Sequence, residues 1–140
     1  MIYSLLIFAA ALPQVPNAAI TPGDVDPKAT KAKVCTVGYT STVRDVPESK
    51  KKEVFAEYKI DRKSSRFEVD HLISLELGGS NDIKNLWPQS YTTQPWNAYK
   101  KDRLENKLHS LVCSGNLELV EAQRAIATDW IRAYSVYVGK

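Results

Sequence analysis

The sequence predicts a single domain of the α+β class, in which several helices brace a small amount of β structure. The clearest helical signal is an apolar stripe from about Leu119 to Tyr137 that repeats close to the 3.6-residue period of a helix. The stripe consists of Leu119, Ala122, Ile126, Trp130 and Tyr134, and we expect it to face the core. The strand signal is an N-terminal short β segment between Val34 and Val43, where β-branched and aromatic residues are frequent. At 140 residues the chain suits one buried core and is too short for two large domains.

Local signals place the other elements. Ala19 to Lys33 is rich in Pro, Thr, Ala and Lys, and this composition predicts an extended arm. Ser49 is a candidate cap for a helix that ends near Tyr58. A second helix is expected over residues 96–111, and the turn Ser114-Gly115-Asn116 separates it from the C-terminal helix.

Three residues in the middle of the chain indicate chemistry. Asp70 offers hard carboxylate oxygens, which suit Mg²⁺, Mn²⁺ or Ca²⁺. His71 has an ordinary pKa near ~6.5, so a neutral fraction is available near neutrality to take a proton from water. Asn85 follows beyond the Gly78-Gly79 loop, and its amide group can tie the segment of His71 to the returning chain. Together they supply the parts of a one-metal phosphodiesterase.

The adjacency of Asp70 and His71 also predicts a feature of the backbone. Neighbouring side chains on an ideal strand point to opposite faces. For both to meet one phosphate, the strand must bend or end at this pair. An Asp-His pair alone is more typical of a structural turn with a satisfied histidine, so the functional interpretation depends on the Gly78-Gly79 loop, on Asn85 and on the motifs that follow.

Five motifs follow one another along the chain. They are Glu68 to Gly79, Asn85 to Pro88, Lys101 to Glu105, Val112 to Gly115 and Ala122 to Trp130. This ordered set resembles the HNH (His-Me finger) endonucleases, in particular a group of small secreted HNH-like proteins. The resemblance runs from about Thr21 to Gly139. It implies a small ββα-metal core, in which a bent hairpin and a following helix enclose one divalent cation.

The resemblance also implies a role for each residue of the hairpin. Asp70 binds the metal, His71 is the general base, and Asn85 orients the loop. Mg²⁺ is the expected cation, with Mn²⁺ or Ca²⁺ as alternatives. The chain has no Cys-x-x-Cys motif, so the structural zinc that braces many HNH modules is not expected.

The helix-borne partner of the metal departs from the family pattern. Many HNH proteins carry a histidine on this helix, whereas here the helix offers Asn97, whose amide oxygen can coordinate a hard cation as in HNN-type relatives. Lys101 lies four residues further on the same helix face and is expected, with Lys100, to hold a flanking phosphate. Glu105, another turn along, is expected to pair with Lys101.

The implied activity is divalent-metal-dependent hydrolysis of phosphodiester bonds in nucleic acid, with DNA as the expected substrate. Little sequence specificity is expected, because the chain shows no helix-turn-helix or zinc finger. The net charge of +3 permits polyanion binding. The first alternative is a non-catalytic nucleic-acid-binding or protein-interaction module on the same ββα scaffold. A second is an exported structural or inhibitory protein.

The N-terminus and the cysteines predict export. Met1 to Leu12 is apolar, too short for a membrane span and suited to a signal peptide, so residues 1–19 are expected to be a signal peptide and residues 20–140 the nuclease domain. The alternative is an N-terminal strand or helix packed on the core. Cys35 and Cys113 are the only cysteines, and one disulfide is expected, with two buried free thiols as the alternative. The expected location is secreted or periplasmic, with no stable membrane insertion.

Overall fold

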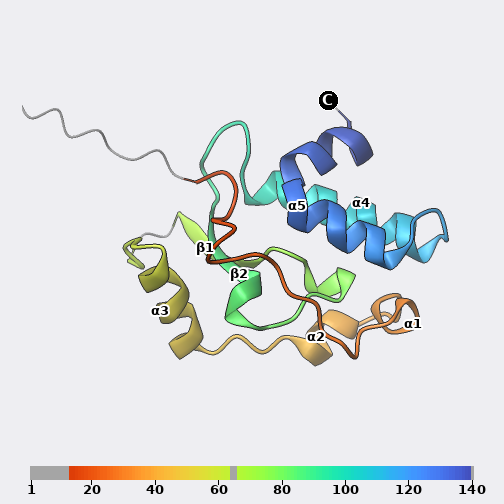
Figure 1. Ribbon diagram of the computed structural model, residues 1–140, viewed down its shortest axis with the longest axis horizontal. Helices are drawn as coiled ribbons and strands as arrows, with labels where there is room; N and C mark the ends of the chain where they lie inside the picture. The colour runs from red at the N-terminus through yellow and green to blue at the C-terminus, as the bar shows by residue number, and fades with distance from the viewer. Residues whose placement is uncertain (1–12, 64–65, 140) are drawn as a thin grey trace, which may run out of the picture.

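The computed structural model describes residues 13–63 and 66–139, and its elements combine helices with one small sheet (Figure 1). The α-helices are α1 (Lys31–Val34), α2 (Tyr39–Val43), α3 (Glu48–Glu57), α4 (Ala98–Cys113) and α5 (Leu119–Tyr137). The strands are β1 (Phe67–His71) and β2 (Leu86–Ser90), and two short 3₁₀ turns, η1 (Leu75–Leu77) and η2 (Ile83–Asn85), lie between them. The α+β class predicted from the sequence is therefore confirmed.

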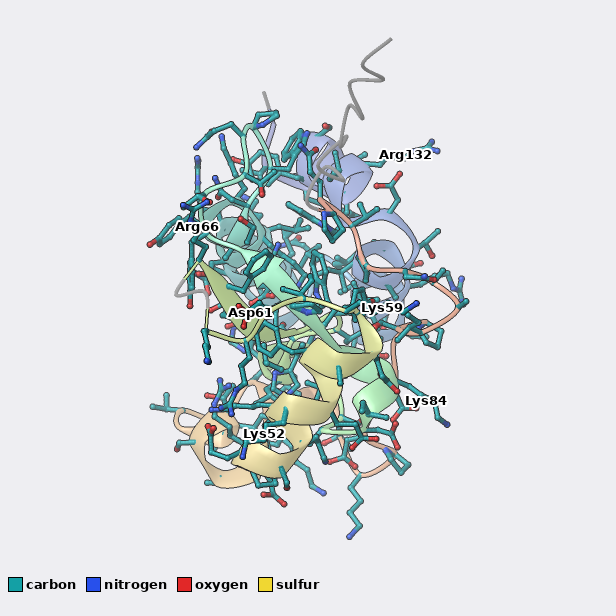
Figure 2. The ribbon with its side chains drawn as sticks, turned by 90° about the vertical axis from the view of Figure 1, so that its left-hand side faces the viewer. Lys52, Lys59, Asp61, Arg66, Lys84 and Arg132 are labelled. Atoms are coloured by element: carbon teal, nitrogen blue, oxygen red, sulfur yellow. A yellow bond between two sulfur atoms is a disulfide. The ribbon has the colours of Figure 1, made fainter. Side chains whose placement is uncertain are left out.

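The two strands form an antiparallel hairpin, with Asp70 opposite Trp87 and His71 opposite Leu86. Helix α3 lies on one side of this hairpin, while α4 and α5 lie side by side on the other (Figure 1). The ring of Phe55 in α3 meets that of Phe67 in β1 edge to face, with 6.4 Å between ring centroids. The exposed Lys52 lies on the outer side of α3, toward the viewer in Figure 2. The order along the chain is strand, strand, helix.

Helices α4 and α5 supply most of the hydrophobic core. Leu104, Leu108 and Val112 of α4 are fully buried in the same cluster as Ile126 and Trp130 of α5. Four of the five residues of the predicted apolar stripe belong to this cluster, and Leu119 packs against it. The bounds of α5 are those predicted. Ile73 and Leu77 join the cluster, so the helical pair also fixes the segment that follows β1.

The predicted strand between Val34 and Val43 is wrong, because this region folds as α1 and α2. Thr30 caps α1 by accepting a hydrogen bond from the backbone N–H of Lys33 at 3.2 Å. Gly38 then adopts φ 84°, a left-handed conformation that favours glycine and starts α2. Val37 is fully exposed, so its β-branched side chain has no sheet to pack on, and strand propensity depends on such packing.

The helix predicted after Pro47 is confirmed as α3, but its cap differs. Pro47 occupies the N-cap position and makes no side-chain bond there, so Ser49 is not the cap. Val54 of this helix is fully buried.

The predicted disulfide joins Cys35, at the end of α1, to Cys113, at the end of α4. Closing a loop of 78 residues stabilises the folded chain by roughly 4 kcal/mol on the chain-entropy estimate. The bridge ties the end of α1 to the end of α4. A disulfide is compatible with an extracellular location.

Most of the predicted signal peptide, residues 1–12, lies outside the described residues. The residues that follow contact the domain. The indole N–H of Trp130 donates to the backbone carbonyl of Gln14 at 3.0 Å, and the N–H of Asn17 donates to the Tyr58 hydroxyl at 3.0 Å. Cleavage of a signal peptide after Ala19 would remove Gln14 and Asn17, and with them both of these hydrogen bonds. Among the described residues, no helix combines the length and apolar character needed to cross a membrane.

Candidate active site

A polar cleft of about 400 Å³ lies where β1, η1, α2 and α4 meet. Its lining residues are Thr40, Arg44, Glu68, Val69, Asp70, His71, Ser74, Leu75, Glu76, Asp102, Glu105 and Asn106. The structure therefore brings Asp70 and His71 to one cavity. A cavity of about 500 Å³ elsewhere is lined by α5 alone and contains none of the predicted site residues.

The end of β1 explains how adjacent side chains reach the same cleft. The strand stops at His71, and the N–H of Leu72 donates to the carbonyl of Asn85 at 2.7 Å, which continues the register of the hairpin by one pair. Consecutive residues from Glu68 to His71 line the cleft, so the cleft extends over the end of this strand. The bend or strand end predicted from the sequence is present.

Asn85 fixes this turn with its side chain and is fully buried. Its Oδ1 accepts from the N–H of Ile73 at 2.9 Å, while its Nδ2 donates to the carbonyls of Ile73 and Ser80, each at 2.9 Å. These bonds tie the chain after His71 to the returning loop, as the chemistry of an amide predicts. Gly79 in this loop accepts no side chain, because a Cβ there would lie 1.7 Å from the Ile73 carbonyl oxygen.

The imidazole of His71 is held by Asn81. His71 Nε2 lies 3.0 Å from Asn81 Oδ1, and Asn81 Nδ2 donates to the carbonyl of Val43 at 2.7 Å. The second bond orients the amide, so its oxygen faces the imidazole and His71 Nε2 must be the donor. In the neutral ring the proton is therefore on Nε2, which leaves the lone pair of Nδ1 available as a base.

Burial keeps this imidazole in its basic form. His71 is 5% exposed, and burial is the main cause that lowers its pKa below the ordinary 6.5. The cations of Arg44 and Lys101 lower the pKa further, whereas the bond to Asn81 and the carboxylate of Asp70 oppose the change. The ring is consequently neutral at pH 7.

Asp70 is positioned by two donors that bind the same oxygen. Its Oδ2 accepts from Lys101 Nζ at 2.8 Å and from the indole N–H of Trp87 at 3.0 Å. Trp87 is its partner across the hairpin, so the strand register itself supplies one of these bonds. Within the described residues no hydrogen bond engages Oδ1, which leaves one hard oxygen of Asp70 for a ligand in the cleft.

Lys101 lies beneath the cleft and not on the surface. Its side chain is fully buried, and its ammonium group also contacts Glu105 Oε1 at 2.5 Å and the carbonyl of His71 at 2.8 Å. Burial alone would lower the pKa of Lys101, but the carboxylates of Asp70 and Glu105 raise it above its ordinary value. The predicted pair with Glu105 is confirmed. In this position Lys101 anchors Asp70 and offers no free charge to a phosphate.

Asn97 and Lys100 lie apart from the residues that line the cleft. Asn97 caps α4: its Oδ1 accepts from the N–H of Lys100 at 3.2 Å, and its Nδ2 donates to the carbonyl of Thr93 at 3.1 Å. The Lys100 ammonium group lies 5.4 Å from the centroid of the Tyr134 ring on α5. Asn97 Oδ1 already accepts the capping bond from the N–H of Lys100, so metal binding by Asn97 would require this same oxygen to coordinate the cation as well. The helix residues that do line the cleft are Asp102, Glu105 and Asn106.

The cleft carries an excess of carboxyl groups over cations. Burial is the leading cause that raises the pKa of each of four of them, Glu68, Glu76, Asp102 and Glu105. Asp70 is the fifth carboxyl group of the cleft. Ser74 is 5% exposed, and its hydroxyl oxygen is buried without a hydrogen-bond partner in the described structure.

Sequence reasoning did not identify two residues of this site, Asn81 and Arg44. Asn81 belongs to the loop after Gly79, and its bond to Val43 depends on the tertiary position of α2. Arg44 follows α2, is exposed, and makes no hydrogen bond or ion pair with its side chain in the part of the chain described. No local pattern distinguishes either residue from ordinary surface residues.

Comparisons with known proteins found no matching family model, no matching curated protein and no matching solved structure. The function is therefore argued from the cleft and from the motifs of the chain itself.

Replacing Asn81 is expected to change the protonation of His71. Asn81→Ala removes the acceptor of Nε2–H and should lower the pKa of His71, because the bond to Asn81 raises it. Asn81→Asp places a carboxylate against the imidazole and should raise this pKa, which NMR titration of the His71 ring measures. The matched control, Asn116→Asp, adds the same charge in the exposed turn after α4. An unchanged His71 pKa in Asn81→Asp would contradict the contact between residue 81 and the imidazole.

Proposed function

We propose that this chain is a divalent-metal-dependent endonuclease of the HNH (His-Me finger) type, which hydrolyses phosphodiester bonds in nucleic acid, with DNA as the first substrate to test. The observation that carries the proposal is the orientation of His71. Asn81 fixes its proton on Nε2, so that Nδ1 is a base at neutral pH beside the Asp70 carboxylate. The strand, strand, helix order of β1, β2 and α4 supports the proposal, because a ββα core has the same order of elements.

The residues of the cleft fit a hard divalent cation. Carboxylate oxygens predominate, the second oxygen of Asp70 is not engaged, and the buried hydroxyl of Ser74 lacks a partner. Asp70 would hold the cation, with Asn97 or a cleft-lining residue of α4, Glu105 or Asn106, as the helix-borne ligand. Mg²⁺, or Mn²⁺ or Ca²⁺ in its place, supplies a Lewis acid that stabilises negative charge on the phosphate and the leaving oxygen.

Three side chains of the protein, His71, Asn81 and Lys101, have separate roles in the proposed reaction. His71 Nδ1 accepts the proton of the attacking water, and the bond from Nε2 to Asn81 keeps the ring aligned while it is protonated. Lys101 holds Asp70 in place through a bond of 2.8 Å.

A plasmid-cleavage assay tests this function. The acidic cleft should repel phosphate without a cation, so we expect nicking of supercoiled DNA with Mg²⁺ or Mn²⁺ and none with EDTA. Asp70→Ala should abolish cleavage and weaken calorimetric binding of the metal. Cleavage in EDTA at the same rate would overturn the metal-dependent mechanism. Salt-sensitive binding without cleavage in any divalent metal would instead establish a non-catalytic module.

The same calorimetry identifies the helix-borne ligand. Asn97→Ser keeps a good N-cap and removes the amide oxygen, so any loss of metal affinity reports coordination and not fraying of α4. Asn106→Ala removes the amide that lines the cleft. The variant that weakens Mn²⁺ binding identifies which of these two side chains coordinates the metal.

Arg44 is expected to contact the phosphate. It lines the cleft and its cation acts on His71, while no described carboxylate pairs with it. Arg44→Gln should raise KM for DNA about 10-fold and reduce the dependence of binding on salt, and Arg44→Lys should restore part of the loss. Lys52→Gln, on the outer side of α3 (Figure 2), is the control for loss of one positive charge. Equal effects of Arg44→Gln and Lys52→Gln would remove Arg44 from the site.

A further inference from the structure

A second group of metal-ligating side chains lies outside the cleft, at the disulfide. The sulfur atoms of Cys35 and Cys113 and a ring nitrogen of His109 all lie within 4.8 Å of one another. His109 and Cys113 are four residues apart on α4 and so share one face of the helix. Cys35 approaches them from the end of α1. Two thiolates and an imidazole are ligands that zinc prefers.

The distance between the helix-borne ligands suits a tetrahedral ion. With Zn–N near ~2.0 Å and Zn–S near ~2.3 Å, tetrahedral angles place the nitrogen and sulfur about 3.5 Å apart. His109 Nε2 lies 3.5 Å from Cys113 Sγ. The two sulfurs, which share a bond in this structure, would separate to about 3.8 Å as two thiolates on one zinc ion.

We propose that the dithiol form of this chain binds one Zn²⁺ through Cys35, His109 and Cys113, with water as the fourth ligand. The disulfide and the metal are then alternative cross-links between α1 and α4. A dithiol reductant supplies two electrons and two protons, so the disulfide becomes two thiols and the reductant becomes its own disulfide. Binding of Zn²⁺ then displaces the two thiol protons to solvent.

The surroundings of His109 indicate how the imidazole would change partners. In the disulfide form His109 Nε2 lies 2.8 Å from the carbonyl of Val34, to which it donates. Coordination by Nε2 requires this bond to open and the ring proton to lie on Nδ1. The carboxylate of Glu76 interacts electrostatically with the His109 ring.

With the zinc site as the alternative to the disulfide, α1 and α4 are cross-linked under both reducing and oxidising conditions. Where thiols stay reduced, Zn²⁺ connects α1 to α4. After oxidation, the disulfide connects the same helices. The sequence does not predict this site, because its ligands lie on two different helices and the two cysteines do not have Cys-x-x-Cys spacing.

Zinc titration of the full, reduced chain tests the proposal. A phosphine is used as the reductant because it supplies no competing thiols, and a chromogenic chelator competes for the zinc. We expect one Zn²⁺ per reduced chain, with an affinity at least about 100-fold higher than that of the disulfide form. His109→Ala should weaken this binding at least about 10-fold. Co²⁺ should give a thiolate charge-transfer band only in the reduced protein.

The disulfide form is the matched control, since it retains the acidic cleft and reports any Zn²⁺ bound there. Asp70→Ala should leave the difference between reduced and oxidised protein unchanged, which separates this site from the proposed nuclease centre. Equal zinc affinity of the reduced and oxidised proteins, or of reduced wild type and His109→Ala, would overturn the proposal. If reduction unfolds the chain, Zn²⁺ should refold it, and failure to do so overturns the proposal equally.

Discussion

Replacement of His71 by alanine is expected to lower the rate of DNA cleavage about 10²- to 10⁴-fold, the range for loss of a general base. The reason lies in the geometry of the cleft, where His71 Nδ1 is the nitrogen left unprotonated by the bond from Nε2 to Asn81. Single-turnover cleavage of plasmid DNA at saturating Mg²⁺ measures the effect without a contribution from product release.

The pH dependence supplies a second measure of the same role. Because burial lowers the pKa of His71 below 6.5, the wild-type rate should be level near neutrality and fall only on the acid side of that value. His71→Ala should lose this acid limb together with the rate. His109→Ala is the matched histidine control and should cleave at nearly the wild-type rate. A His71→Ala protein with wild-type activity would exclude the proposed mechanism.

The sequence predicted the parts of the site that depend on local geometry. Asp70 and His71 are neighbours, so one strand end is enough to bring both to the same cavity. Asn85 bonds to Ile73, a residue of the turn that directly follows His71, across a short loop. The Lys101–Glu105 pair is one helical turn apart, and this spacing alone predicts it.

The parts that the sequence did not predict depend on where distant segments pack. Asn81 holds His71 only because α2 presents the carbonyl of Val43 to it. The region from Val34 to Val43 looks like a strand from composition, yet the disulfide and the Gly38 turn hold it as two short helices. The fully exposed Val37 shows that composition overstated the strand signal.

Burial is the property that separates Lys101 from Lys100. Both occupy adjacent positions of α4, and both were expected to contact phosphate. Lys101 is fully buried with two carboxylate partners, whereas Lys100 lies over the Tyr134 ring toward α5. The helical rotation between neighbouring residues is therefore enough to turn a candidate phosphate contact into the internal support of Asp70.

Lys101→Met should be among the most destabilising single changes in the described structure. It keeps the length of the side chain but leaves the carboxylates of Asp70 and Glu105 without their shared cation. Loss of one partner from a buried ion pair typically reduces the free energy of unfolding by about 3–5 kcal/mol. Urea unfolding at pH 7 measures this loss. Lys100→Met is the matched control and should cost about 2 kcal/mol or less, the contribution of a cation–π contact between a half-buried lysine and a buried ring.

The pH dependence of the stability of Lys101→Met shows whether the loss comes from an unpaired carboxylate or from lost packing of the lysine side chain. Burial raises the pKa of Glu105 to about 8, and Lys101 opposes this, so removal of Lys101 raises the folded-state pKa further. Above pH 8 the folded variant then keeps a proton that the folded wild type loses, and its stability relative to wild type should fall as the pH rises from about 7 to about 9. Adding Glu105→Gln should recover more stability at pH 9 than at pH 7. A deficit that is the same at both pH values would show that Lys101 acts through packing and not through its charge.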